Sequence, residues 1–244
     1  YQGQGPGEIT IIGHVGIDET NRRFFVSDHG KLKIFAYDLD SVLTTPEYQP
    51  SVKIDMKKKL FPDDYLYLND TLCIAKIIEP IGNNDYKPSV ARWNMATGEI
   101  NPMPYEYPDL KKVRFIYAAS AEHQLYVQCY TQYDLMTICD FNGNLKCNIY
   151  GPKWVNEKTQ TQHYSLGVEF CGDKILALYS GGDHRTDAYY PTKFLVFDLN
   201  GNYLKTLETG YMITDFCYDK ENNRLIINLN DEIQFAYLDL EGII

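Results

Sequence analysis

The sequence predicts an all-β fold, a β-propeller of four-stranded antiparallel blades, and three observations lead to this prediction. The chain of 244 residues holds 21 Tyr and 11 Phe, and this composition, with many Val, Ile and Thr, favours β-sheet. Opening strands begin near residues 13, 64, 115, 164 and 213, so the repeat is 49 to 51 residues long. A turn that follows an Asp or Asn recurs in most repeats. Four short strands in a period of about 50 residues are typical of propeller blades.

The recurring turn is clearest at residues 197–205, where an aromatic strand ends in Phe197-Asp198 and the next strand follows Asn200-Gly201. Asn-Gly favours a two-residue type I′ hairpin, because both central residues then take positive φ. The equivalent ends of the third strands are Asp38, Asn94, Asp140 and Asp239. We expect these residues to serve the turn between the third and fourth strands, on the face opposite the long loops.

The first two blades are expected at 13–56 and 64–104, after a loop at 1–12 that ends in a short apolar step. Their strands alternate polar and apolar residues and are separated by polar turns, for example at 19–21 and 28–30. The fourth strand of the second blade is weak. The expected strands are 13–18, 23–27, 31–38 and 51–56, then 64–69, 72–79, 89–94 and 100–104.

The other three blades are expected at 115–150, 164–208 and 213–244, and all five form one domain of residues 1–244. The expected strands are 115–120, 124–130, 135–140 and 145–150, then 164–170, 174–179, 192–198 and 203–208, then 213–219, 224–228 and 232–239. The fifth blade lacks a fourth strand, and an open blade exposes a sheet edge that is liable to aggregate. We therefore expect a six-bladed protein whose N-terminal blade and closing strand preceded Tyr1, with a five-blade ring as the alternative.

Charge and hydropathy exclude two classes of partner. The net charge of −10 argues against nucleic acid, which needs a basic surface, and the run Lys57-Lys58-Lys59 is interpreted as a solvated turn. No apolar run approaches the ~18 residues of a membrane span, so we expect no transmembrane segment. We expect a monomer.

The six cysteines are expected to be free thiols that pack as small apolar side chains: Cys73, Cys129, Cys139, Cys147, Cys171 and Cys217. Cys139 and Cys147 flank the Asn142-Gly143 turn. A two-residue loop would pair 139 with 146 and 147 with 138, which directs the two thiols to opposite faces and makes a disulfide between them unfavourable.

The first 40 residues resemble a known family. The phrase Gly3-Gln4-Gly5-Pro6-Gly7-Glu8, followed by Val15-Gly16-Ile17-Asp18 and Phe25-Val26-Ser27-Asp28, is similar to NHL-type and TolB-like six-bladed β-propellers. It looks most like the bacterial 6-bladed β-propeller proteins that occur as secreted proteins or lipoproteins of gut Bacteroidetes. The resemblance implies a periplasmic or cell-surface location and a binding role. In such relatives the Gly-Pro-Gly-Glu phrase follows an earlier blade.

Candidate binding residues lie on the loops that join second to third strands and fourth strands to the next blade. The most prominent loop is 180–191, because long loops in compact domains are often functional. Asp183, His184 and Asp187 are potential metal ligands and Arg185 a potential carboxylate ligand, but without a matched partner elsewhere we expect no metal and no cofactor. Two further loops, 81–88 and 151–163, are expected on the same face.

Aromatic side chains on these loops suggest a carbohydrate or protein ligand. Candidate stacking platforms for sugar rings are Tyr105, Tyr107, Trp154, Tyr189 and Tyr190. The alternative interpretation is that the same rings fasten the loops to the propeller body.

Motifs for catalysis are absent from the sequence: there is no Gly-x-Ser-x-Gly elbow, phosphate loop or His-Glu-x-x-His helix. We therefore expect a binding or scaffold protein rather than an enzyme. The alternative is a glycan-active hydrolase or lyase that uses paired carboxylates at the central channel. The acids on or beside the innermost strands are Asp18, Asp64, Glu169 and Asp215.

Overall fold

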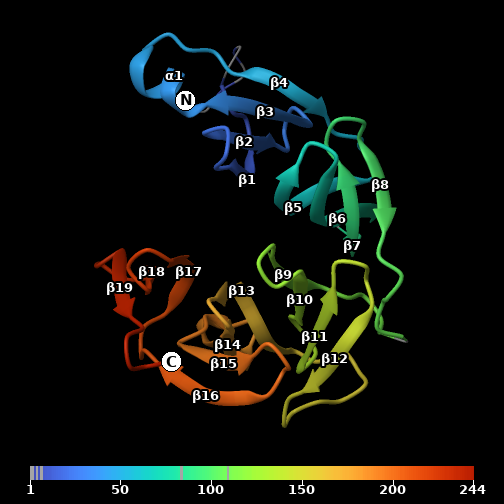
Figure 1. Cartoon of the computed structure of the whole chain (residues 1–244). Helices are drawn as coiled ribbons and strands as arrows, with labels where there is room; N and C mark the ends of the chain where they lie inside the picture. Colours follow the sequence, from blue (N-terminus) through green and yellow to red (C-terminus); the bar gives the residue numbers. More distant parts are fainter. Residues whose placement is uncertain (1–2, 4, 6–7, 83–84, 109) are drawn as a thin grey trace. The chain divides into compact units, whose positions relative to one another are not determined.

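The computed structural model describes residues 3, 5, 8–82, 85–108 and 110–244, and Figure 1 follows them through a succession of twisted sheets. These residues form five antiparallel sheets of consecutive strands, four with four strands and one with three. The prediction of an all-β propeller built from blades is confirmed. Two compact units divide the chain, Tyr1–Glu106 with two blades and Tyr107–Ile244 with three. No helix within the described ranges has the length and apolar character needed to cross a bilayer.

The first unit contains the blades β1–β4 and β5–β8. An unexpected short helix follows β3, because the Asp38 carboxylate accepts a hydrogen bond from the Ser41 backbone N–H at 2.8 Å and caps the helix. The third-to-fourth-strand connection of the first blade is therefore not a tight hairpin. The elements are β1 (Ile12–Asp18), β2 (Arg23–Asp28), β3 (Lys33–Asp38), α1 (Leu39–Thr44), β4 (Ser51–Asp55), β5 (Phe61–Asn69), β6 (Leu72–Gly82), β7 (Asp85–Asn94) and β8 (Glu99–Pro102).

The second unit contains the blades β9–β12, β13–β16 and β17–β19. Its elements are β9 (Phe115–Ser120), β10 (Leu125–Tyr130), β11 (Leu135–Asp140), β12 (Leu145–Tyr150), β13 (Thr161–Cys171), β14 (Lys174–Asp183), η1 (Asp187–Tyr189), β15 (Lys193–Asp198), β16 (Tyr203–Glu208), β17 (Ile213–Asp219), β18 (Arg224–Leu229) and β19 (Phe235–Asp239). The third strand of the last blade is the edge of its sheet in the described residues, as the sequence predicted.

Two of the expected long loops are shorter than predicted, because the strands beside them extend further. In the first unit β6 runs to Gly82 and β7 begins at Asp85, so most of the predicted loop 81–88 is strand. Its residues Asn83 and Asn84 lie outside the described part, as do Gln4, Pro6 and Gly7 of the Gly-rich phrase. In the second unit β14 runs to Asp183, which leaves 184–192 as the connection to β15.

The predicted type I′ turn is wrong at both Asn-Gly copies. Gly143 and Gly201 have φ of 80° and 85°, but neither Asn142 nor Asn200 has positive φ. Gly201 N–H donates to the Asp198 carbonyl at 3.0 Å, and the ladder shifts register beside Phe197. This is a type I turn followed by a glycine bulge. It forms because the Asp198 carboxylate accepts hydrogen bonds from the Asn200 and Asn202 backbone N–H groups at 2.8 and 2.9 Å.

The same bulge changes one predicted cysteine register. Cys147 lies opposite Ile138 as expected, but Cys139 lies opposite Leu145 instead of Lys146. All six thiols are free, and four of them are buried. Burial raises the pKa of Cys139 to about 11, which keeps this thiol protonated and unreactive.

The apolar core lies between neighbouring blades rather than within any one sheet. Phe25 and Ile34 of the first blade pack with Tyr65 and Trp93 of the second, and equivalent clusters join the three blades of the second unit. Close blade contact requires glycine on an innermost strand: a Cβ on Gly16 would lie 2.4 Å from Cε2 of Tyr65. Within each unit, alternating strands therefore place one face of a blade against its neighbour.

Candidate functional site

Three connections of the second unit converge to form a surface that we call the loop face: residues 131–134, 151–160 and 184–192. They follow the second strand of one blade, its fourth strand, and the second strand of the next blade. Backbone hydrogen bonds join them in sequence, from Gly151 to Asp134, Thr159 to Gln132, His163 to Thr131 and His184 to Gln160, with donor–acceptor distances of 2.7 to 3.2 Å. These bonds place the residues predicted at 151–163 and 180–191 side by side.

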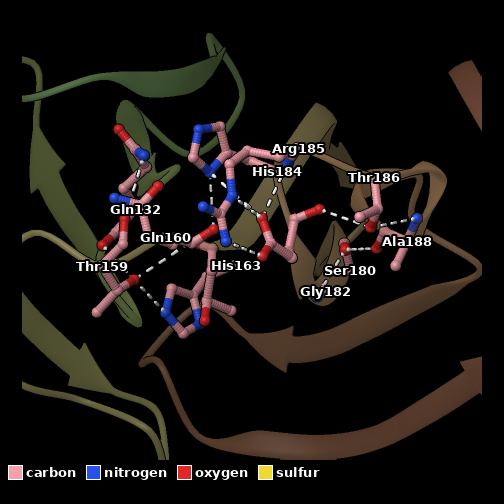
Figure 2. Close-up of polar contacts among 12 residues, drawn as sticks. Gln132, Thr159, Gln160, His163, Ser180, Gly182, His184, Arg185, Thr186 and Ala188 are labelled. Carbon is pink, nitrogen blue, oxygen red and sulfur yellow. Dashed lines mark hydrogen bonds and ion pairs between the residues drawn. The ribbon is translucent and has the colours of Figure 1, made fainter.

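The turn after β14 is a closed structure in which the predicted ligand groups bind each other (Figure 2). The Arg185 guanidinium donates from Nε and Nη2 to the two oxygens of Asp183 at 3.0 and 2.6 Å. This pairing, with the Arg185 backbone N–H, holds the pKa of the Asp183 carboxyl far below its usual range. Arg185 is consequently already occupied by a carboxylate of its own loop.

His184 fastens this turn to the neighbouring connection, since its Nδ1 lies 2.8 Å from the Gln160 carbonyl oxygen and must carry a proton to donate there (Figure 2). Ser180 Oγ donates to the Ala188 carbonyl at 2.7 Å and closes the loop from the other side. The side chain of Asp187 lies outside the described part. Among the described residues no group of three His, Cys, Asp or Glu side chains is arranged to hold a metal ion.

The predicted aromatic platforms separate into two groups. Tyr189 and Tyr190 pack on each other with centroids 4.2 Å apart. Tyr107 and Trp154 pack edge-to-face at 5.8 Å and share a cluster with Tyr150, whose ring centre lies 5.1 Å from that of Trp154. Tyr105 belongs to the first unit. The rings of the second group are thus already in contact with one another and anchor the 151–160 connection.

A buried polar network, which sequence reasoning missed, lies beneath the loop face. Asp134 and His163 are each 1% exposed, and the Tyr179 hydroxyl lies 3.2 Å from both Asp134 Oδ1 and His163 Nδ1. The second oxygen of Asp134 accepts the Lys153 backbone N–H at 2.9 Å. Gly151 makes room for this carboxylate, because a Cβ there would lie 2.2 Å from its atoms.

The protons of this network follow from its geometry. Tyr179 has a single hydroxyl hydrogen, which it donates to the Asp134 carboxylate, so its oxygen accepts from His163 Nδ1–H. Burial lowers the pKa of His163. The nearby Asp134 carboxylate raises this pKa, and the Lys153 ammonium lowers it further. His163 is therefore neutral at neutral pH, with its proton on Nδ1. The network is fully paired, which orders the base of the loop face.

A cavity of about 440 Å³ opens beside this network, between the blades β9–β12 and β13–β16. A volume of this size falls in the range of small-molecule sites. Its inner wall is apolar and aromatic, formed by Ile149, Tyr164, Leu195 and Phe197, and Asp134 and Tyr179 lie at its polar end. Tyr150 and Tyr203, 51% and 56% exposed, stand on two sides of it.

Two lysines complete the cavity, Lys153 from the 151–160 connection and Lys193 from the start of β15. The Lys193 ammonium lies 5.7 Å from the centre of the Tyr179 ring, a cation–π contact. The cavity therefore combines a ring-lined wall with positive charge, which is the composition of a site for a small polar ligand.

Of the four acids expected at a central channel, Asp18 and Asp64 have separate local partners. Asp18 is buried and accepts from the Asn21 backbone and side chain, which is a turn role, and Asp64 pairs with His14 at 2.9 Å. Asp215 lies on β17, where burial raises the pKa of its carboxyl group. Burial is the main cause of the raised pKa of the Cys217 thiol, and the carboxylates of Glu169, on β13, and Asp215 add to it.

Little in the sequence singles out Asp134, Tyr179 or Lys193. Tyr179 and Lys193 lie within ordinary strand patterns, and Asp134 lies in a short turn. The one available signal was Gly151-Pro152 directly after a strand, which marks a turn with close backbone approach.

Comparison with known proteins supports the fold. Residues 1–71 match the model of a family described as 6-bladed beta-propeller. None of the curated proteins matches the chain. Among solved structures, a member of the DUF4221 family from Bacteroides vulgatus is 12% identical, with a TM-score of 0.61 over 98% of this chain and 81% of that one.

Two further structures are similar at low identity. The extracellular domain of BT4673 from B. thetaiotaomicron, named as a one component system, is 10% identical with a TM-score of 0.59, over 95% of this chain and 28% of that one. This chain thus spans less than a third of that protein. A gluconolactonase from Xanthomonas campestris is 16% identical with a TM-score of 0.52, over 89% of this chain and 69% of that one.

At these identities the structural likeness establishes the fold alone, and the narrower resemblance to NHL-type and TolB-like propellers stays a prediction. The five sheets lead to one conclusion: the chain is a β-propeller protein, and its first 71 residues match a family of 6-bladed propellers.

Proposed function

We propose that this protein is a non-catalytic binding propeller that takes a small carbohydrate or similar polar ligand on the loop face of its second unit. The observation that carries the proposal is the 440 Å³ cavity between the blades β9–β12 and β13–β16. It combines exposed tyrosines for stacking with a few polar groups for orientation, as ligand sites do.

The ordered base of the cavity also supports this proposal. The network of Asp134, Tyr179 and His163 is buried and paired, so the cavity wall is preorganised and ligand binding requires little ordering of the protein. The Asp183–Arg185 turn next to it contributes a rigid rim rather than a free ligand-binding arginine.

The proposal is tested by titrating the purified protein with a panel of mono- and disaccharides in a calorimeter. Thr206 lines the cavity, so Thr206→Trp fills it and is expected to abolish binding. Lys146→Trp, on the exposed part of β12 outside the cavity, is the matched control and is expected to bind normally. Absence of binding to every saccharide, or equal binding by Thr206→Trp, would contradict the proposal.

The location and assembly are part of the same proposal. The family resemblance and the extracellular B. thetaiotaomicron domain support a periplasmic or cell-surface protein. We propose that both units belong to one propeller domain and that the protein is a monomer. Fractionation of the native host tests the location, and light scattering of the purified chain tests whether it is a monomer.

Asp215 supports a second candidate function. In this alternative the protein is a glycan hydrolase or lyase that uses acids on the innermost strands. Partial desolvation raises the pKa of the exposed Asp215 carboxyl group, which is the direction that a general acid needs, and Glu169 lies near the same Cys217 thiol. Hydrolysis of a glycan that is lost in Asp215→Asn and kept in Asp18→Asn would support this candidate. A rate that is unchanged in Asp215→Asn would exclude it.

A further inference from the structure

The cavity between the blades β9–β12 and β13–β16 has an uneven charge. Lys153 and Lys193 both line it, in a protein whose net charge is −10. The Lys193 ammonium lies over the Tyr179 ring, and that of Lys153 lies beside Gly181 at the cavity edge, 3.7 Å from the point where a Cβ would stand. Within the described residues neither ammonium has a carboxylate within ion-pair distance.

The acid that lines the cavity is already bound to other groups. Asp134 is the one acidic side chain among the described residues that line the cavity. Its oxygens accept from the Tyr179 hydroxyl and from the Lys153 backbone N–H, and the side chain is 1% exposed. Asp134 offsets part of the positive charge, but it is buried and both of its oxygens already accept hydrogen bonds.

One exposed acid competes for Lys193. Glu208 lies directly opposite Lys193 in the β15–β16 ladder, yet it lines the neighbouring hollow beside β19. Directly opposite side chains of an antiparallel pair share a face, so Glu208 must be included in any test of the charge of Lys193.

We propose that the ligand of this cavity is an acidic sugar, whose carboxylate is bound by Lys153 and Lys193 while its ring packs against Tyr150 and Tyr203. This inference rests on the proposed function and assigns its ligand class. An anion supplies the counter-charge that the two ammonium groups lack, and their hydrogen bonds to a carboxylate are charge-assisted. The tyrosines present an apolar ring face with a polar tip, which suits the two faces of a sugar.

The test compares cellobiouronate with cellobiose, which differ in a carboxylate and a hydroxymethyl group at one carbon. We expect the acid to bind at least tenfold more tightly than the neutral sugar in a calorimeter, because charge-assisted hydrogen bonds are stronger than neutral ones. Lys153→Met and Lys193→Met are each expected to lose about tenfold for the acid and nothing for cellobiose. Lys146→Met, on the exposed part of β12, is the matched control and is expected to retain full affinity.

Two further measurements sharpen the assignment. Glu208→Gln is expected to tighten binding of the acid, because it removes the acid that competes for Lys193. Raising the salt concentration from 0.05 to ~0.5 M is expected to weaken cellobiouronate and to leave cellobiose unchanged, because screening acts on exposed charges. Melting curves of each variant confirm that it is folded.

The outcomes separate this inference from the proposed function. Equal affinity for both disaccharides, or full affinity in both lysine variants, would overturn the acidic-sugar assignment and leave the binding function in place. If cellobiose 6-sulfate binds as tightly as cellobiouronate, the preference for a carboxylate is overturned. Failure of both disaccharides and of the whole saccharide panel to bind would overturn the proposed function as well.

Discussion

The sharpest test of the buried network is Gly151→Ala. A methyl group at this position would lie 2.2 Å from the carboxyl carbon and both oxygens of Asp134, which is far inside contact distance. The strain cannot come from the backbone, because Gly151 is not among the residues with positive φ. It must be relieved by moving Asp134, which is held by Tyr179 and by the Lys153 backbone N–H.

The clash can be accommodated by crowding the core or relieved by breaking a hydrogen bond of Asp134, and the expected loss of stability follows from these two possibilities. Overpacking costs about 1–3 kcal/mol, and each hydrogen bond lost from a charged group costs about 1.5–3 kcal/mol. We therefore expect Gly151→Ala to lower the free energy of unfolding of the second unit by about 2–4 kcal/mol. For a protein of this size the melting temperature should fall by roughly 4–16 °C, at about 2–4 °C for each kcal/mol.

Urea denaturation followed by Trp154 fluorescence measures this loss, in a Trp93→Phe background so that the signal reports on the second unit alone. Lys146→Ala is the control in the second unit, because Lys146 is exposed on β12. The control should change the free energy of unfolding by less than about 0.5 kcal/mol, as surface substitutions do.

A double-mutant cycle identifies the cause. In an Asp134→Ala background the carboxyl group is gone, so Gly151→Ala should cost less than about 1 kcal/mol. An equal loss in both backgrounds would show that the methyl group clashes with something other than Asp134, and the account of Gly151 would be refuted.

Three further predictions concern other parts of the molecule. Gly16→Ala should destabilise the first unit by about 1–3 kcal/mol in urea, because its Cβ would overlap the Tyr65 ring, and a neutral result would contradict the blade contact. The pKa of His163 is lowered in the folded protein, so on acidification the unfolded chain takes up the proton at a higher pH than the folded protein does. The free energy of unfolding should therefore fall as the pH drops below about 6.5. The urea midpoint should depend less on pH in His163→Gln, and an unchanged slope would exclude this residue. Phe235→Lys and Tyr237→Lys, 64% and 67% exposed on the edge strand β19, should reduce aggregation at high concentration by light scattering, and unchanged scattering would show that this edge is harmless.

The residues around Asp198 show how local sequence and tertiary structure share the control of a turn. Asn200-Gly201 correctly located the hairpin, because glycine at positive φ is a local requirement. The turn type was wrong, because the Asp198 carboxylate captures two backbone N–H groups and stabilises the bulged form. Asp38 has the same place in its blade but caps a helix, since no glycine follows it.

For the candidate site, too, local sequence predicted the position of the loops but not the pairing of their side chains. The loops at 151–163 and 180–191 could be located in advance, because they interrupt a regular strand period. Their chemistry could not: Asp183 and Arg185 looked like free ligands, and the structure pairs them with each other. Lys153 and Lys193 are 40 residues apart in the chain, and only blade packing brings them to one cavity.

By itself, the sequence determined the repeat: its period, the four-stranded blade, the alternation that faces one blade toward the next, and the position of the turns. These properties depend on interactions within about ten residues or on the alternation of side chains along a strand. Only the tertiary structure decided which polar groups are paired and which remain available to a ligand. Asp134 lies in the turn between β10 and β11, His163 on β13 and Tyr179 on β14, so their pairing is set by how two blades pack rather than by any local pattern.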